Sequence, residues 1–161
     1  MTLRRTVSGI AASAALLIGI AVHEGYRGEA YVPVPGDRPT IGFGDTHGVQ
    51  LGDTTDPVRA LIRLGEHVDR IQREMRACLG DVPLHQHEWD AYVSLAYNIG
   101  TGAWCGSTLV KKLKQDPPDY EGACAEIRRW VYFQGRVLPG LVTRREAEYR
   151  MCMGLSDGAA R

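Results

Sequence analysis

Apolar residues recur along most of the chain at the spacing of helices that bury one face. Between positions 56 and 80 they fall every three or four residues, which predicts a long amphipathic helix. Asp56 is suited to cap its N-terminus, Pro57 to occupy its first position and Gly80 to end it. The same pattern predicts further helices over 85–100, after the cap Ser107, over 120–133 and over 141–153.

The N-terminal segment has a different pattern. Thr6–Val22 carries no charge and follows the two arginines of MTLRR, as in an exported signal or a membrane anchor with its N-terminus in the cytoplasm. The apolar run is shorter than the ~20 residues of a usual spanning helix, and it is rich in Ala, Gly and Ser. Apolar residues continue after ASA, which argues against cleavage there. We therefore interpret residues 1–22 as a weak, uncleaved anchor, with a buried core helix as the alternative.

Residues 30–53 interrupt the helical pattern. The stretch holds three prolines and five glycines between β-branched and aromatic residues, which predicts a short, irregular antiparallel hairpin. One helix, a small β region and several further helices make an α+β domain dominated by helix.

Composition narrows the possible partners. A chain of 161 residues predicts one domain, and 19 basic residues against 19 acidic ones leave no excess charge that would favour nucleic acid. Four cysteines allow two disulfides in three possible pairings, with buried free thiols as the alternative. Their spacing does not fit a zinc site, and we expect no metal and no cofactor.

Glu24 is the first candidate for chemistry. It follows the apolar run directly, and apolar neighbours favour a protonated carboxyl group that can act as a general acid. A solvated carboxylate at a helix end is the alternative. Gly42 and Gly44 would expose backbone to a bound ligand, or would serve the turn. The histidines share no spacing with the carboxylates, so we assign them no catalytic role.

Four ordered blocks of sequence extend the picture from His23 to about Met153. They are HEGYRGEAY, PTIGFGDT, LHQHEWDAYVSLAYNIGTGAWCGSTLVKKL and GRVLPGLVTRREAE. Together they resemble the phage-type lysozymes, the endolysin muramidases of glycoside hydrolase family 24. The N-terminal segment is similar to that of the signal-arrest-release subgroup, whose members are exported on an uncleaved weak anchor and are active after release.

The resemblance implies a lysozyme-like fold over residues 23–161, with a cleft between the β region and the helices. It also implies hydrolysis of the β-1,4 bond between N-acetylmuramic acid and N-acetylglucosamine. Glu24 then takes the place of the general acid and Thr40 that of the residue across the cleft. Arg144 is our choice for the partner of the acid, with Arg145 in reserve. Supporting roles fall to Tyr31, Asp45 and Asn98.

The chain departs from the family pattern where the second carboxylate belongs. The two ways of counting, from Glu24 and from Thr40, arrive at Pro33 and Val34, neither of which can position a water molecule. Asp37 is the nearest carboxylate and is our candidate for this role, although PGDRP is also typical of a turn. Asp45 stands where many relatives carry histidine and is suited to organising the hairpin.

The expected partners follow from this resemblance. They are peptidoglycan glycan strands and, before release, the inner membrane; we expect no nucleic acid and a monomer. The protein would be exported to the periplasm, tethered and then released to the cell wall. Two alternatives stay open: a lytic transglycosylase that forms 1,6-anhydro products, and a non-catalytic wall-binding protein.

Overall fold

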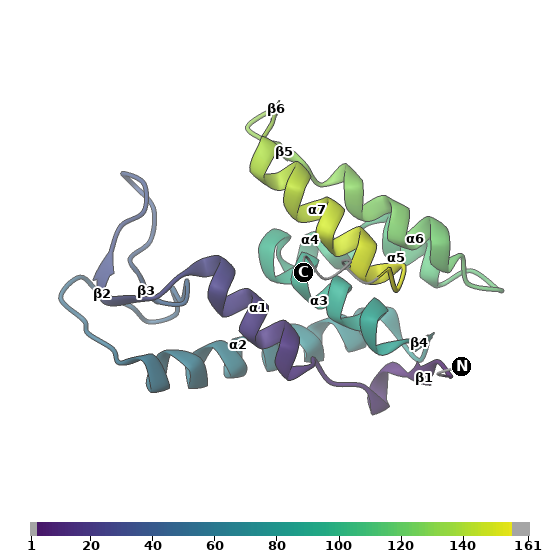
Figure 1. Ribbon diagram of the computed structural model, residues 1–161, viewed down its shortest axis with the longest axis horizontal. Coiled ribbons are helices and arrows are strands. Elements are labelled where there is room, and N and C mark those ends of the chain that lie inside the picture. Colours follow the sequence, from purple (N-terminus) through teal and green to yellow (C-terminus); the bar gives the residue numbers. More distant parts are fainter. Residues whose placement is uncertain (1–2, 156–161) are drawn as a thin grey trace, which may run out of the picture. The chain divides into compact units, whose positions relative to one another are not determined.

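Helices make up most of the computed structural model, which describes residues 3–155, and short antiparallel strand pairs lie between them (Figure 1). This confirms the predicted α+β class. The helices are α1 (Ala14–Glu24), α2 (Pro57–Leu79), α3 (Gln86–Ile99), α4 (Thr101–Cys105), α5 (Thr108–Leu113), α6 (Tyr120–Glu126) and α7 (Pro139–Cys152). The 3-10 turns are η1 (Val7–Gly9) and η2 (Ile127–Arg129). The strands are β1 (Arg5–Thr6), β2 (Arg27–Tyr31), β3 (Thr40–Gly42), β4 (Pro83–Leu84), β5 (Tyr132–Phe133) and β6 (Arg136–Val137).

The chain divides into two compact units. Unit 2 is Ala14–Arg70, and unit 1 holds the described residues up to Ser13 and from Ile71 onward. The long helix α2 contributes to both, since its first part belongs to unit 2 and its last turns to unit 1.

In unit 2, β2 and β3 pair as an antiparallel hairpin, which confirms the predicted β region although it begins earlier, at Arg27. Tyr31 lies opposite Thr40, and Arg27 lies opposite Gly42. The following loop adds to the hairpin, because the Ala30 amide donates to the Asp53 carbonyl at 3.0 Å. The hairpin and the loop together form the β part of this unit.

The caps of α2 are those that the sequence predicts. One carboxylate oxygen of Asp56 accepts hydrogen bonds from the amides of Val58 at 2.9 Å and Arg59 at 3.0 Å. Pro57 begins the helix, and Gly80 follows it with a φ of 77°, the left-handed conformation that ends many helices. Local chemistry therefore accounts for both ends of the helix.

The core of unit 1 forms where α3 packs against α7 and α5 against α6 (Figure 1). Its largest fully buried side chains include Trp89, Tyr92, Leu95 and Trp104. Disulfides join Cys78 to Cys105 and Cys124 to Cys152, so the alternative of free thiols is wrong. Both bonds tie together helices of unit 1.

Two predicted helices differ from those observed. The first begins only at Ala14, after β1 and η1. The helix predicted over 120–133 ends at Glu126, continues as a 3-10 turn and gives way to the hairpin β5–β6. Gln134 and Gly135 both have positive φ, at 47° and 75°, the geometry of a two-residue turn that matches the twist of a hairpin. The aromatic residues before this turn are therefore in a strand.

Residues 4–13 are built into unit 1. Arg5 and Thr6 in β1 pair with Leu84 and Pro83 in β4. Val7 and Ile10 are buried, and the carbonyls of both accept hydrogen bonds from the Arg76 guanidinium. Among the described residues, no helix combines the length and the apolar character needed to cross a membrane.

Candidate active site

Glu24 is the last residue of α1 and is exposed. The helix buries Leu16, Ile20 and Ala21, but this buried face does not extend to Glu24. Of the two alternatives for Glu24, the structure favours the exposed carboxylate at a helix end over a carboxyl group surrounded by apolar side chains. The position of Glu24 at the junction of α1 and the hairpin agrees with the prediction that it follows the first helix.

Thr40 is the first residue of β3 and is buried, and its hydroxyl donates to the Arg38 carbonyl at 3.2 Å. Tyr31 lies opposite it on β2 and has the Arg27 guanidinium 5.1 Å from its ring centroid. The hairpin therefore brings Tyr31 and Thr40 together, as two of the predicted site residues.

Asp37 closes a turn. Its amide donates to the Val34 carbonyl at 2.9 Å, and its carboxylate accepts from the Arg38 amide at 2.8 Å. Pro35 and Gly36 occupy the central positions, and Gly36 has the positive φ, 86°, that a type II turn requires there. The carboxylate is exposed, so its second oxygen is accessible to solvent. Both the turn geometry and a water-positioning role are compatible with this arrangement.

Asp45 organises the end of the hairpin. It exchanges two backbone hydrogen bonds with Ile41, at 2.9 and 3.0 Å, and its carboxylate accepts from the His47 amide at 2.9 Å. The other carboxylate oxygen pairs with the Arg63 guanidinium on α2 at 3.1 Å. A carboxylate at this position can therefore attach the hairpin to α2 through a basic side chain.

Gly42 serves packing rather than access for a ligand. It is buried, its φ is 65°, and a Cβ atom added there would lie 3.0 Å from the Cβ atom of Ala60. The hairpin therefore approaches α2 closely at this point, and the expectation of exposed backbone is wrong for Gly42.

In unit 1 a polar network leads from the exposed Asn98 into the core. The Arg145 guanidinium donates to the Asn98 side-chain oxygen, to the Trp130 carbonyl at 2.9 Å and to the Glu148 carboxylate at 2.5 Å. Ser94 donates to the same carboxylate at 2.7 Å. Burial lowers the pKa of the Arg145 guanidinium, and the adjacent Glu148 opposes that shift. The network therefore fixes the Asn98 side chain through its hydrogen bond with the buried Arg145.

Arg144 joins this network through Glu148, which its Nε atom approaches at 3.2 Å. Neither arginine faces solvent, and both pair with the same buried carboxylate. Asn98 contacts Arg145, the residue held in reserve. The spacing of an acid three residues after Arg145, with Ser94 and Asn98 one turn apart on α3, is the sequence signal that would have indicated the network.

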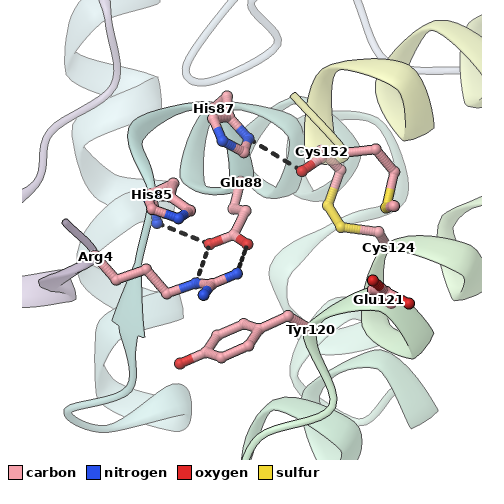
Figure 2. Close-up of a pocket in the computed structure, with 9 residues that line it drawn as sticks. Arg4, His85, His87, Glu88, Tyr120, Glu121, Cys124 and Cys152 are labelled. Atoms are coloured by element: carbon pink, nitrogen blue, oxygen red, sulfur yellow. Dashed lines mark hydrogen bonds and ion pairs between the residues drawn. A yellow bond between two sulfur atoms is a disulfide. The ribbon is translucent and has the colours of Figure 1, made fainter. Parts of the chain in front are cut away.

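A second buried carboxylate in unit 1 was not expected from the sequence. Figure 2 shows Glu88 accepting two hydrogen bonds from the Arg4 guanidinium, at 2.7 and 3.2 Å, and one from the His85 amide at 2.7 Å. Arg4 also lies over the Tyr120 ring, 3.7 Å from its centroid. Glu88 is only 3% exposed, so the pair joins the N-terminal segment to the start of α3. Within residues 3–155, no three His, Cys, Asp or Glu side chains gather as metal ligands would.

The candidate residues are thus divided between the two units. Unit 2 contains Glu24, Tyr31, Asp37, Thr40 and Asp45, and unit 1 contains Asn98 and Arg144. Comparison with known proteins identifies the family of the chain, and the match includes residues of both units. The model of the phage lysozyme family matches residues 21–148. The chain belongs to the phage lysozyme family.

Two endolysins and a solved lysozyme structure are similar to this chain over most of their length. An endolysin of Acyrthosiphon pisum secondary endosymbiont phage 1 is 39% identical over 136 residues, which are 82% of this chain and 90% of the relative. A SAR-endolysin of Enterobacteria phage P21 is 31% identical over 150 residues, 89% of this chain and 87% of the relative. Among solved structures, a P22 lysozyme mutant superposes with a TM-score of 0.75 at 27% identity, over 89% of this chain and 99% of that one. The lysozyme-like fold is therefore confirmed.

Proposed function

We propose that this phage lysozyme family member is an endolysin that lyses the bacterial host by hydrolysing the β-1,4 bond between N-acetylmuramic acid and N-acetylglucosamine in peptidoglycan. The observation that carries the proposal is the family match over residues 21–148, which includes every candidate residue from Glu24 to Arg144. The names of the relatives, endolysin and SAR-endolysin, support the same activity.

Glu24 is the proposed general acid. A glutamic acid donates its proton to the glycosidic oxygen as the bond breaks, while a water molecule attacks the sugar from the opposite face. The proposed residue across the cleft is Thr40, whose buried hydroxyl belongs to β3 and is held by the Arg38 carbonyl. While this hydroxyl donates to the Arg38 carbonyl, its oxygen can accept a hydrogen bond from the attacking water.

Asp37 is the proposed second carboxylate. An inverting hydrolase needs a base about 6.5–9.5 Å from the acid, so that a water molecule fits between the two groups. Asp37 is exposed and lies three residues before Thr40, whose hydroxyl donates to the Arg38 carbonyl. Tyr31 and Asp45 support the hairpin, and Asn98 and Arg144 are further proposed supporting residues.

Replacement of the acid gives the first test. We expect Glu24→Gln to abolish cell-wall clearing, because the amide has no proton to donate, while the folded structure is unchanged. Wild-type digests of purified peptidoglycan are then analysed by mass spectrometry, and reducing sugar ends are expected. Full activity of Glu24→Gln would remove this residue from the acid role.

The same spectra separate the alternatives. A lytic transglycosylase needs only one acid and produces 1,6-anhydro ends, whereas a non-catalytic wall-binding protein produces no new ends. The family match and the endolysin relatives favour the hydrolase over both alternatives.

Export by a weak anchor is the second part of the proposal. We propose that residues 1–22 first hold the protein at the inner membrane with residues 23–161 in the periplasm, and then leave the bilayer. The similarity to SAR-endolysins supports this sequence of events. Residues 4–13 contact unit 1 through backbone pairing and the Arg4–Glu88 ion pair, and they cannot make these contacts while they are in lipid. We propose that these contacts form in the released state.

Fractionation of cells tests this release. We expect full-length protein in the membrane fraction before depolarisation of the membrane and in the periplasmic fraction afterwards. Protein that is always in the cytoplasmic fraction would contradict the anchor and would leave the proposed hydrolase activity unaffected.

A further inference from the structure

A cavity in unit 2 lies beside the candidate catalytic hairpin and has no role in the proposed bond cleavage. Its volume is about 400 Å³, and its lining side chains come from the loop around β3 and from α2. Those that bear or can gain positive charge are Arg38, His47, His67 and Arg70. A cavity of this size accommodates a small ligand or a short peptide segment.

The lining has one carboxylate, from Asp45, and its charge is already compensated. One of its oxygens pairs with Arg63 at 3.1 Å, and the other accepts from the His47 amide at 2.9 Å. Within residues 3–155, neither the Arg38 nor the Arg70 guanidinium forms an ion pair with a carboxylate. Two guanidinium groups are thus available to an anion that enters the cavity.

Two further cavities within the described residues lack this excess of positive charge. A second cavity of unit 2, about 410 Å³, has Arg59 and Arg63 balanced by Asp53 and Glu66. The cavity of unit 1 shown in Figure 2 is lined by two carboxylates, Glu88 and Glu121, and Arg4 is paired with Glu88. Since the whole chain has no net charge, the positive lining near the hairpin is a local feature.

We propose that this cavity binds a carboxylate of the peptide stems carried by the glycan strand. Guanidinium groups bind carboxylates with two parallel hydrogen bonds, and the Arg38 and Arg70 side chains supply two such groups. Arg38 is also the residue whose carbonyl holds the Thr40 hydroxyl, so the cavity adjoins the proposed catalytic strand. This inference rests on the proposed function, because it takes peptidoglycan as the substrate. It makes the enzyme selective for strands that bear peptides.

Binding of a soluble muramyl peptide with free carboxylates provides a test that does not depend on hydrolysis. Arg70→Gln removes one guanidinium group of the cavity, and we expect the Kd measured by calorimetry to rise about tenfold. Arg73→Gln is the matched control, because Arg73 is exposed on the same helix and does not line the cavity. The Arg73→Gln variant should have the Kd of wild type. A muramyl peptide with amidated carboxyl groups should bind wild-type protein as weakly as the peptide with free carboxylates binds Arg70→Gln.

Kinetics on two substrates complete the test. On intact peptidoglycan, Arg70→Gln should raise KM with kcat unchanged, whereas on strands stripped of their stems it should equal wild type. Three results would each overturn the inference. They are an equal Kd for Arg70→Gln and Arg73→Gln, an equal Kd of wild-type protein for the amidated and the free peptide, and a loss of activity of Arg70→Gln on both substrates. Binding of anionic phospholipid vesicles that depends on Arg70, in the absence of binding to the muramyl peptide, would also overturn it. Wild-type protein that binds the peptide but hydrolyses neither substrate would contradict the proposed function alone.

Discussion

Arg145 is the side chain that joins Asn98, Trp130 and Glu148 in the polar network of unit 1. It is only 1% exposed, and its three donors serve a carboxylate, a side-chain amide and a main-chain carbonyl. A buried cation is tolerated only when it is paired and hydrogen-bonded, and Glu148 and Trp130 supply those partners. The exposed Asn98 therefore depends on a group that substrate does not touch.

Replacement of Arg145 should destabilise the protein strongly. Arg145→Met removes the three contacts and leaves the buried Glu148 with Arg144 as its remaining basic partner, so we expect the free energy of unfolding to fall by about 3 kcal/mol. Urea denaturation measures this change. Arg136→Met, at an exposed position of β6, is the control and should alter stability by less than about 0.5 kcal/mol. Similar stabilities of the two variants would show that the network is not needed for folding.

Asp37 permits a substitution that separates charge from turn geometry. Asn keeps the side-chain oxygen that accepts from the Arg38 amide, so Asp37→Asn should fold normally. If Asp37 positions the water, the rate of peptidoglycan hydrolysis should fall at least tenfold, which is about 1.4 kcal/mol of barrier. Asp37→Ala, which loses the turn bond as well, measures the structural contribution. An unchanged rate in Asp37→Asn would assign the residue to the turn alone.

At single positions, the sequence predicts where a residue lies in the order of elements, but it does not predict whether its side chain is buried. The place of Glu24 after a helix follows from element order, whereas the pairing of Tyr31 with Thr40 depends on a strand register that only the structure supplies. The exposure of Glu24 does not follow, because burial depends on which face of α1 is covered. The choice between Arg144 and Arg145 depends in the same way on the rotation of α7, since adjacent residues of a helix point about 100° apart.

Among the elements, the hairpin is held against α2 at two points. Asp45 pairs with Arg63, and Gly42 lies against Ala60 one turn earlier on the helix. The first contact is electrostatic and partly exposed, so it contributes little. The second is a close approach that only glycine permits, because it combines a positive φ with a lack of space for a side chain.

A methyl group at position 42 should therefore be costly. Gly42→Ala places a Cβ atom against Ala60 in a left-handed conformation, and we expect a loss of about 2 kcal/mol or more in urea denaturation. Gly65→Ala is the matched control on α2, where no atom lies within 4 Å of the added Cβ atom. This control should stabilise the protein by up to about 1 kcal/mol, because alanine favours helix. A neutral Gly42→Ala would mean that the hairpin can move away from α2.

Elements with strong end signals could be predicted from the sequence, and the others could not. The ends of α2 and the cap of α5 follow from Asp56, Gly80 and Ser107, whose local hydrogen bonds form in any tertiary context. The end of α6 depends on the competing hairpin turn at Gln134 and Gly135. Residues 5–9 form a strand and a 3-10 turn because β4 and Arg76 supply partners that are distant in the sequence.

For the whole molecule, the tertiary cross-links gather in unit 1. Both disulfides lie there, each closing a loop of 27 or 28 residues, and such loops contribute on the order of 3–4 kcal/mol each in chain-entropy models. The N-terminal segment adds a non-covalent attachment to the same unit. It differs from the disulfides because it can be released and formed again, which the proposed passage from membrane to cell wall requires.

The Arg4–Glu88 pair is the part of this attachment that a single substitution can test. Arg4→Gln leaves the buried Glu88 without its cation and removes the contact with the Tyr120 ring. Because the Arg4 side chain is 35% exposed, we expect about 2 kcal/mol of lost stability, less than for a fully buried pair. The three tryptophans of the chain, Trp89, Trp104 and Trp130, all belong to unit 1, so their fluorescence in urea reports the unfolding of that unit.

Arg5→Gln is the control for this measurement, since it changes the charge of the N-terminal segment equally at an exposed neighbouring position. An effect on export that Arg4→Gln and Arg5→Gln share then reflects the lost charge. A difference between their free energies of unfolding reflects the Arg4–Glu88 pair. The double variant Arg4→Gln/Glu88→Gln should lose less than the two single variants added together, because the amide no longer needs a buried cation. Additive losses, or equal stabilities of Arg4→Gln and Arg5→Gln, would mean that the released segment docks without this ion pair, by its strand pairing and buried apolar residues alone.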